Sequence, residues 1–214
     1  MKARPSAWPI LFTIGWLMVA VPAEAAENDK IGAFFEESFS HEAVARYEAS
    51  LNSVLKILRV DQKNYLATLR AGWLNYLRGD QGSSEKYYRK TIDLAPAAVE
   101  PRLGLLLPLI AAKKWTEAEA CARAALRIDG KNYTAMSKLA YSLFNREKYE
   151  EARTLYQGVL DNYPSDTEMK LGLAWTHQRL GKKDEARRYF REVLEVYRGN
   201  QSALQGLEVL QKGM

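Results

Sequence analysis

The sequence predicts an all-α fold, an α-solenoid of stacked antiparallel helix pairs. Three observations lead to this fold class. Residue types recur with one fixed period, the interval from Ala118 to Ala152 and on to Ala186; the recurring apolar positions have helical spacing; and proline or glycine ends each unit at the same phase. With 47% hydrophobic residues, 27% charged residues and one cysteine among 214 residues, the composition is that of a folded protein without an internal disulfide bond.

The first 25 residues predict an export signal. Basic residues precede an apolar run from Trp8 to Val21, and small residues follow at the spacing that signal peptidase recognises. The segment resembles a cleavable secretory signal that is cut between Ala25 and Ala26. An uncleaved anchor helix is the alternative, but the apolar run is shorter than the ~20 residues that cross a bilayer. We therefore expect an exported protein, periplasmic in a bacterium or secreted, with no transmembrane segment after cleavage.

The period is clearest in the second helix of each unit. A small residue is followed four positions later by a core position and four positions later again by an aliphatic residue, which places all three on one helix face. The three sets are Ser50, Ser84, Ala118, Ala152 and Ala186; Val54, Tyr88, Ala122, Tyr156 and Phe190; and Leu58, Ile92, Leu126, Leu160 and Leu194. The helix breakers Pro96, Gly130 and Pro164 share one phase as well. An unrelated helical bundle would not repeat a single register in this way.

Four units are predicted, at residues 65–98, 99–132, 133–166 and 167–200. Residues 26–64 are expected to form an N-terminal segment with a degenerate first unit. Residues 201–214 are expected to form a C-terminal capping helix, with Leu204, Leu207 and Leu210 on its apolar side. Pro108 falls inside the first helix of its unit, where it removes a backbone amide and is expected to kink or shorten that helix.

The third unit resembles the tetratricopeptide repeat (TPR) family. The residues that carry the resemblance are Leu139-Ala140-Tyr141, Glu147-Lys148-Tyr149-Glu150-Glu151-Ala152, Leu155-Tyr156 and Tyr163-Pro164. The resemblance implies a right-handed superhelix whose first helices line a concave groove, and a groove that holds a segment of a partner protein. It implies a non-catalytic interaction module or scaffold, and with the export signal it indicates an assembly factor for an envelope or secretion complex.

Matched positions in the first helices give the residues expected to line this groove. They are Trp73, Tyr76, Leu77, Leu107, Ile110, Tyr141, Phe144, Asn145, Trp175, Gln178 and Arg179. Trp73, Tyr141 and Trp175 share one phase and would form an aromatic stripe if exposed, whereas the alternative is that they pack between units. Family members that clamp a peptide C-terminal carboxylate use lysine, arginine and asparagine along this stripe. Its residues here indicate an apolar or amphipathic segment as the ligand instead.

Basic residues concentrate near the end of the array. Lys182, Lys183, Arg187, Arg188 and Arg191 form either a basic patch for an acidic partner or anionic polysaccharide, or a solvated helix face whose charges pair locally. The first possibility makes an accessory role in polysaccharide export or carbohydrate binding the alternative function. Nucleic acid is not expected, because the formal charge is only +5 and no recognition motif is present.

The sequence offers no catalytic or metal-binding motif. His41 and His177 are far apart, and neither has a second ligand at metal-binding spacing. Cys121 lies among alanines and is interpreted as a small helix filler, while His177 shares the phase of Leu109 and Leu143 and is interpreted as a packing residue. We therefore expect no enzyme activity, no cofactor and no metal.

Overall fold

The computed structural model describes residues 23–212, with side chains from Asp29 onward. This part of the chain contains eleven α-helices and no strand. The predicted export signal lies outside the described residues except for its last three, which begin the first helix, so the predicted cut between Ala25 and Ala26 falls within helical backbone. No helix of the described residues is long and apolar enough to span a membrane.

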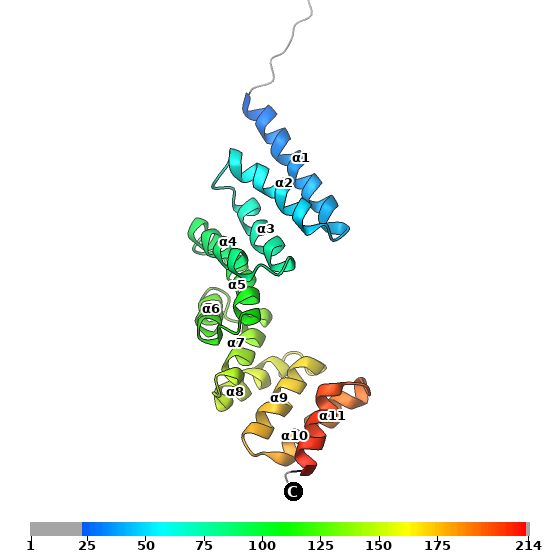
Figure 1. Ribbon diagram of the computed structural model, residues 1–214. Coiled ribbons are helices and arrows are strands. Elements are labelled where there is room, and N and C mark those ends of the chain that lie inside the picture. Colours follow the sequence, from blue (N-terminus) through cyan, green and yellow to red (C-terminus); the bar gives the residue numbers. More distant parts are fainter. Residues whose placement is uncertain (1–22, 213–214) are drawn as a thin grey trace, which may run out of the picture.

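The helices follow one another with short connections (Figure 1). Their bounds are α1 Ala23–Ala43, α2 Tyr47–Val60, α3 Tyr65–Leu77, α4 Gln81–Leu94, α5 Glu100–Ala111, α6 Trp115–Ile128, α7 Tyr133–Asn145, α8 Tyr149–Leu160, α9 Thr167–Arg179, α10 Lys183–Val196 and α11 Gln201–Lys212. Each predicted interval between residues 65 and 200 contains two helices, and residues 26–64 contain α2 and most of α1. Pro108 lies within α5, which continues past it and has 12 residues where α3, α7 and α9 have 13.

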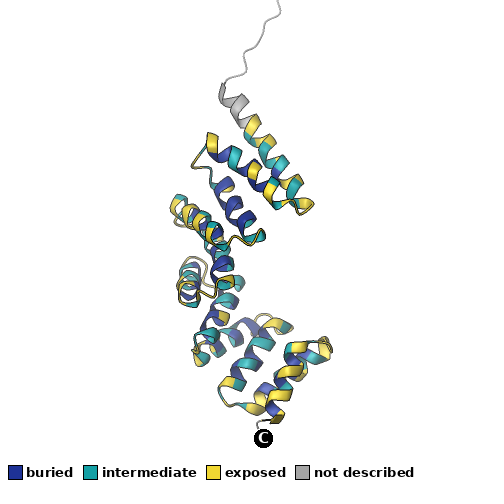
Figure 2. Ribbon diagram, viewed as in Figure 1, coloured by how far each residue is buried: buried dark blue, intermediate teal, exposed yellow. Residues whose placement is uncertain are grey.

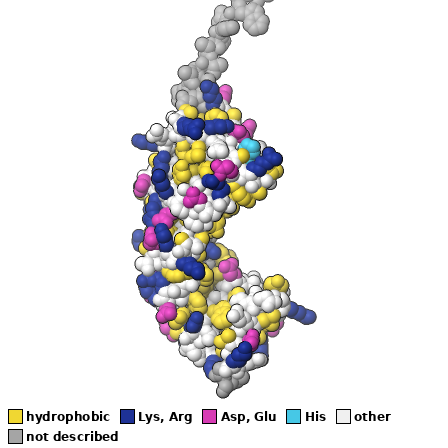
Figure 3. Space-filling model, in the orientation of Figure 1, with side chains coloured by type: hydrophobic (Ala, Val, Ile, Leu, Met, Phe, Trp, Pro, Cys, Tyr) yellow, Lys and Arg dark blue, Asp and Glu magenta, His cyan; other side chains and the backbone are white. Residues whose placement is uncertain are grey.

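Consecutive helices pack against one another to form the solenoid. From α3 onward, the backbone of each first helix also approaches the first helix of the next pair, whereas the backbones of successive second helices stay apart. The row of first helices α3, α5, α7, α9 and α11 is therefore the shorter, inner side of a curved array. Figure 2 shows that these inner helices contain many of the buried residues. Figure 3 shows the hollow that the curvature leaves on one side of the molecule.

Large aromatic rings on second helices pack against glycines on the next helix. The rings of Tyr88, Tyr156 and Phe190 are buried, and they lie over Gly104, Gly172 and Gly206, which follow them at one constant interval along the chain. A Cβ built on these glycines would come within 2.2–2.5 Å of a ring atom, closer than carbon atoms approach without displacement. In the two remaining pairs neither residue type recurs, because Val54 and Ala122 precede Arg70 and Lys138 by the same interval.

The second helices carry ion pairs that recur with the repeat. Arg89 Nε donates to Glu85 Oε1 at 2.9 Å, and its Nη2 reaches Glu117 Oε2 at 2.7 Å. One period later, Arg123 makes the same two contacts, to Glu119 at 2.9 Å and to Glu151 at 2.7 Å. Consecutive units are therefore tied by matching charges on their outer side as well as by packed rings.

Two local features of the helix ends also recur with the repeat. The side chains of Asn64, Asn132, Asp166 and Asn200 each accept a hydrogen bond from a backbone amide three residues later and so cap the first helices α3, α7, α9 and α11. Within each hairpin turn one residue has positive φ, namely Ala45, Gly79, Lys113, Glu147 and Gly181. Only two of these five are glycine, the residue that adopts this conformation without steric cost.

The aromatic-on-glycine contact predicts opposite effects for two glycine substitutions. Gly172→Ala should lower the free energy of unfolding by roughly 1–3 kcal/mol, because its methyl group overlaps the Tyr156 ring. Gly158→Ala is the matched control on α8, where the nearest atom to the new Cβ is 3.7 Å away, and it should raise stability by about 0.5–1 kcal/mol. Urea unfolding measures both. Equal effects from the two substitutions would contradict the packing described for Tyr156.

The turn residues predict a stabilising substitution. Glu147 is exposed with a φ of 62°, so Glu147→Gly should stabilise the protein by about 1 kcal/mol by removing the left-handed strain. Gly181→Ala, at the equivalent turn with a φ of 74°, should cost a similar amount. Thermal unfolding of both variants tests this, and a lower melting temperature for Glu147→Gly would show that strain at this turn does not limit stability.

Candidate functional site

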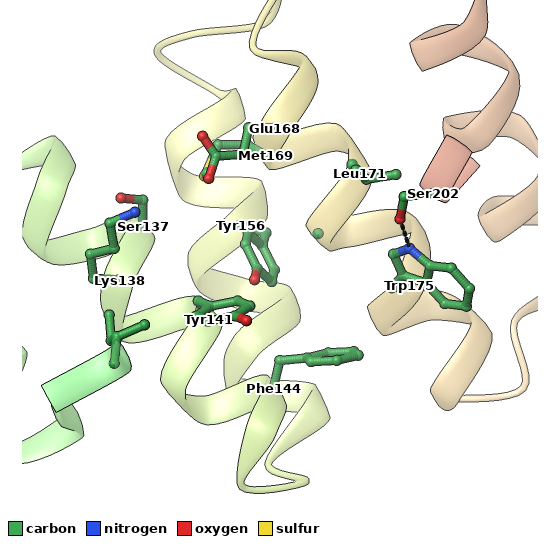
Figure 4. A pocket seen from close by; sticks show the side chains of 12 residues that line it. Ser137, Lys138, Tyr141, Phe144, Tyr156, Glu168, Met169, Leu171, Trp175 and Ser202 are labelled. Carbon is green, nitrogen blue, oxygen red and sulfur yellow. Dashed lines mark hydrogen bonds between the residues drawn. The ribbon is translucent and has the colours of Figure 1, made fainter. Parts of the chain in front are cut away.

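A pocket of about 410 Å³ opens on the inner side of the array between α7 and α9. We call it the α7–α9 pocket (Figure 4). Its lining comes mainly from first helices and consists of Ile110, Ser137, Lys138, Tyr141, Phe144, Tyr156, Glu168, Met169, Leu171, Gly172, Trp175 and Ser202. A cavity of this size, with a largely apolar wall and a few polar groups, is typical of a binding site.

Helical spacing explains why these side chains meet. On α7, Ser137, Tyr141 and Phe144 are separated by four and three residues and therefore share one face. On α9, Leu171 and Trp175 are one turn apart at the same phases as Ser137 and Tyr141. Because α7 and α9 are both first helices and touch, their equivalent faces border one cavity.

The structure brings together four of the residues predicted to line a groove. Ile110, Tyr141, Phe144 and Trp175 line the α7–α9 pocket. The other seven predicted residues lie outside its lining. They are Trp73, Tyr76 and Leu77 on α3, Leu107 on α5, Asn145 on α7, and Gln178 and Arg179 on α9.

The three aromatic residues of the expected stripe differ in their surroundings. Tyr141 is exposed, with 44% of its surface accessible, whereas Trp73 and Trp175 are half-buried. The indole N–H of Trp73 donates to Glu42 Oε1 at 2.7 Å, and that of Trp175 donates to Ser202 Oγ at 2.9 Å. Each tryptophan is therefore held partly within the array by a neighbouring first helix, and Tyr141 is the freest of the three.

The repeat contains two further members of this phase that the sequence analysis missed. Phe39 on α1 lies one period before Trp73, and Val209 on α11 lies one period after Trp175; they are 51% and 39% exposed. Both residues could have been found from the sequence, by moving one repeat period back from Trp73 and one forward from Trp175. Phe39 lies under the Arg70 guanidinium, whose carbon is 3.7 Å from the ring centre, and Arg70 is bonded to Glu42 at 2.7 Å. These contacts join α1 to α3.

Tyr156 contributes a polar group to the pocket. Its side chain is 3% exposed, and its hydroxyl has no hydrogen-bond partner among the described residues. Burial raises the pKa of Tyr156 well above its usual range, so the hydroxyl stays protonated and can donate. Two other phenols of the array do have acceptors, since Tyr65 donates to Glu100 at 3.1 Å and Tyr133 to Asp166 at 2.5 Å.

The predicted basic patch lies at the start and along one side of α10. Lys182 Nζ is 3.6 Å from Glu150, Arg187 is 2.8 Å from Asp184, and Arg188 is 3.7 Å from Glu192. Lys183 also has an interaction partner, and Arg191 is exposed beside the shallow surface formed with Leu194, Glu195 and Arg198. Most of the patch is thus neutralised by acidic neighbours.

Cys121 and His177 occupy packing positions on helices that do not pack together, α6 and α9. Burial raises the pKa of Cys121 to about 11, and its thiol donates to the carbonyl of Arg102 at 3.3 Å. His177 is 8% exposed and stacks on Tyr189 with a centroid separation of 5.7 Å. Within residues 29–212, no group of three His, Cys, Asp or Glu residues is placed to hold a metal ion.

His177 predicts a loss of stability in mild acid. Its Nδ1 is buried without a hydrogen-bond partner, and burial lowers its pKa, an effect that Lys182, Arg153 and Arg188 reinforce and Glu185 opposes. Since the unfolded chain then binds a proton more readily than the folded protein, stability falls as the pH drops below about 6.5.

His177→Leu restores the residue found at the equivalent buried positions Leu109 and Leu143. It should raise the free energy of unfolding by about 1 kcal/mol at pH 7, because the unsatisfied nitrogen is removed. The gain should increase toward pH 5.5. Chemical unfolding at several pH values measures this difference, and a gain independent of pH would show that His177 is not the titrating group.

Comparison with known proteins agrees with this architecture. Residues 131–199 match the tetratricopeptide repeat family model. No curated protein matches the sequence significantly. Among solved structures, a MamA fragment from Desulfovibrio magneticus RS-1 is 17% identical and superimposes with a TM-score of 0.75, covering 81% of this chain and 98% of its own. YrrB, described as a TPR protein with an unusual peptide-binding site, is 16% identical with a TM-score of 0.73 and coverages of 86% and 96%. The chain therefore has the fold of a TPR solenoid, and the match and the fold together support the tetratricopeptide repeat family.

Proposed function

We propose that this chain is a non-catalytic protein-interaction module that binds an apolar or amphipathic segment of a partner protein on its inner surface. The observation that carries the proposal is the α7–α9 pocket, with exposed Tyr141 at its wall. Tyrosine and tryptophan are the side chains most enriched among residues that dominate binding energy, and both line this pocket.

The chemistry of the wall favours an apolar ligand. Ile110, Phe144, Leu171 and Met169 supply hydrocarbon surface, and the only charged lining residues are Lys138 and Glu168. One lysine opposed by one glutamate does not form the cluster of cations that recognition of a carboxylate requires. YrrB supports a peptide as the class of ligand, because its described peptide-binding site belongs to a protein of the same fold.

We further propose that the module acts outside the cytoplasm, as an assembly factor for an envelope or secretion complex. The support for this is the export signal predicted for residues 1–25, together with the fold of an interaction scaffold. An anionic polysaccharide is the alternative ligand. The local pairing of Lys182, Arg187 and Arg188 leaves that alternative without a clear cationic surface.

A charge placed in the pocket should weaken binding. Tyr141→Asp changes an exposed residue, so the fold should persist, while a desolvated carboxylate would oppose an apolar ligand and weaken binding at least about tenfold. The measurement is affinity capture from the native envelope extract, with the captured proteins quantified by mass spectrometry.

Val196→Asp provides the matched control. Val196 is 73% exposed on α10 and does not line the pocket, so this variant should capture the same partner as the wild type. Circular dichroism confirms the fold of both variants. If Tyr141→Asp retained the partner, or if both variants lost it equally, the α7–α9 pocket would not be the contact surface.

A further inference from the structure

The α7–α9 pocket contains a hydrogen-bond donor that the array itself leaves unused. Tyr156 lies over Gly172, and a Cβ at residue 172 would be 2.9 Å from the tyrosine hydroxyl oxygen. The absence of a side chain at residue 172 therefore leaves the hydroxyl uncovered. Both residues line the pocket, and Figure 4 shows the Tyr156 side chain between α7 and α9, beside Tyr141.

The Tyr156 hydroxyl oxygen is not among the buried polar atoms that lack a partner, so it is open to the pocket. A ligand that covers it must therefore supply an acceptor or lose a hydrogen bond. A neutral phenol can donate to a carboxylate or to a carbonyl oxygen, but a largely apolar wall disfavours the burial of a charged carboxylate, so a carbonyl oxygen is the better partner here. In a helical ligand nearly all backbone carbonyls are already bonded within the helix. In an extended segment they are free, so an extended segment satisfies the phenol more readily.

The remaining lining defines the side chain that accompanies this carbonyl. Tyr141, Leu171 and Trp175 surround the space with aromatic and aliphatic surface. Lys138 and Glu168 have opposite charges, and neither forms an ion pair among the described residues, so the rim has no net charge to offer a charged ligand. Charge complementarity thus favours an uncharged side chain, and the volume of about 410 Å³ favours a bulky one.

We infer that the α7–α9 pocket binds an extended segment of a partner protein, which inserts a bulky uncharged apolar side chain and whose backbone carbonyl accepts a hydrogen bond from the Tyr156 hydroxyl. This inference rests on the proposed function and deepens it, because it specifies the conformation of the ligand and the atom that is recognised.

The test uses acetylated and amidated heptapeptides with a fixed central residue, with binding followed by tryptophan fluorescence and calorimetry. Peptides with central Phe or Leu should bind more tightly than those with central Asp or Lys. Tyr156→Phe keeps the ring over Gly172 and removes only the donor, so it should weaken binding about five- to tenfold. Tyr88→Phe is the matched control, since Tyr88 packs on Gly104 in the same way but does not line the pocket.

An ester scan of the best peptide identifies the acceptor. Replacing one amide by an ester weakens that carbonyl as an acceptor, and at the recognised position the loss should appear in the wild type and disappear in Tyr156→Phe. Equal affinity of Tyr156→Phe and wild type would overturn the inference, as would tighter binding of a helix-stapled peptide than of its linear form. Failure of every peptide to bind the wild type would contradict the proposed function itself.

Discussion

The contact between a large ring and a glycine on the following helix is the constraint on which the array depends. Tyr88, Tyr156 and Phe190 each need a position without a side chain on the next helix, and Gly104, Gly172 and Gly206 provide it. Where the second helix has a small side chain instead, at Val54 and Ala122, the facing helix carries the long side chains of Arg70 and Lys138. The contact between ring and glycine occurs at three of the five equivalent positions, where it places α5, α9 and α11 against the preceding second helix and so shapes the inner surface.

Electrostatic contacts reinforce the same register on the outer side. Burial raises the pKa of Glu119, but hydrogen bonds from Lys148, Arg123 and Arg146 outweigh this effect and hold the pKa below its usual value. The carboxylate therefore stays ionised and paired at neutral pH. The equivalent Glu85 binds Arg89 and Lys114 in the same arrangement. Such pairs contribute modestly to stability when they are exposed. They oppose a shift of one unit against the next because Arg89 and Arg123 each bridge a glutamate of their own helix and one of the next second helix. This use of the basic residues also explains why so few of them are available to a ligand.

The sequence was sufficient for the solenoid fold because the residue types that form the helix pairs recur with the period. The all-helical array and its pairs of helices follow from the spacing of alanines, aromatics and breakers. The pocket was only partly predictable, since Ile110, Tyr141, Phe144 and Trp175 were assigned to the inner surface but Lys138, Glu168 and Ser202 were not. Periodicity identifies which face a residue occupies, but it does not show what covers that face. Trp73 is partly covered by Glu42 of α1, a contact that no other unit repeats. Likewise, Leu204 was expected on the apolar side of α11 and is 43% exposed, because the Phe190 ring rests on Gly206 and turns Ala203 and Leu210 inward instead.

Gly172 matters both for the stability of the array and for the proposed binding site. The residue must lack a side chain so that the Tyr156 ring can pack, and the same absence uncovers the hydroxyl at the edge of that ring. Gly104 makes room for the Tyr88 ring in the same way. The first helix of that unit, however, has Leu107 at the position where the α7–α9 pocket has Tyr141. The difference between the two units therefore lies in the residues of the first helices, which are free to vary because hairpin packing does not use them. A repeat whose helix interfaces are fixed can thus acquire a specific site through changes on the inner faces of neighbouring helices, and the Tyr156 hydroxyl distinguishes that site from a merely apolar hollow.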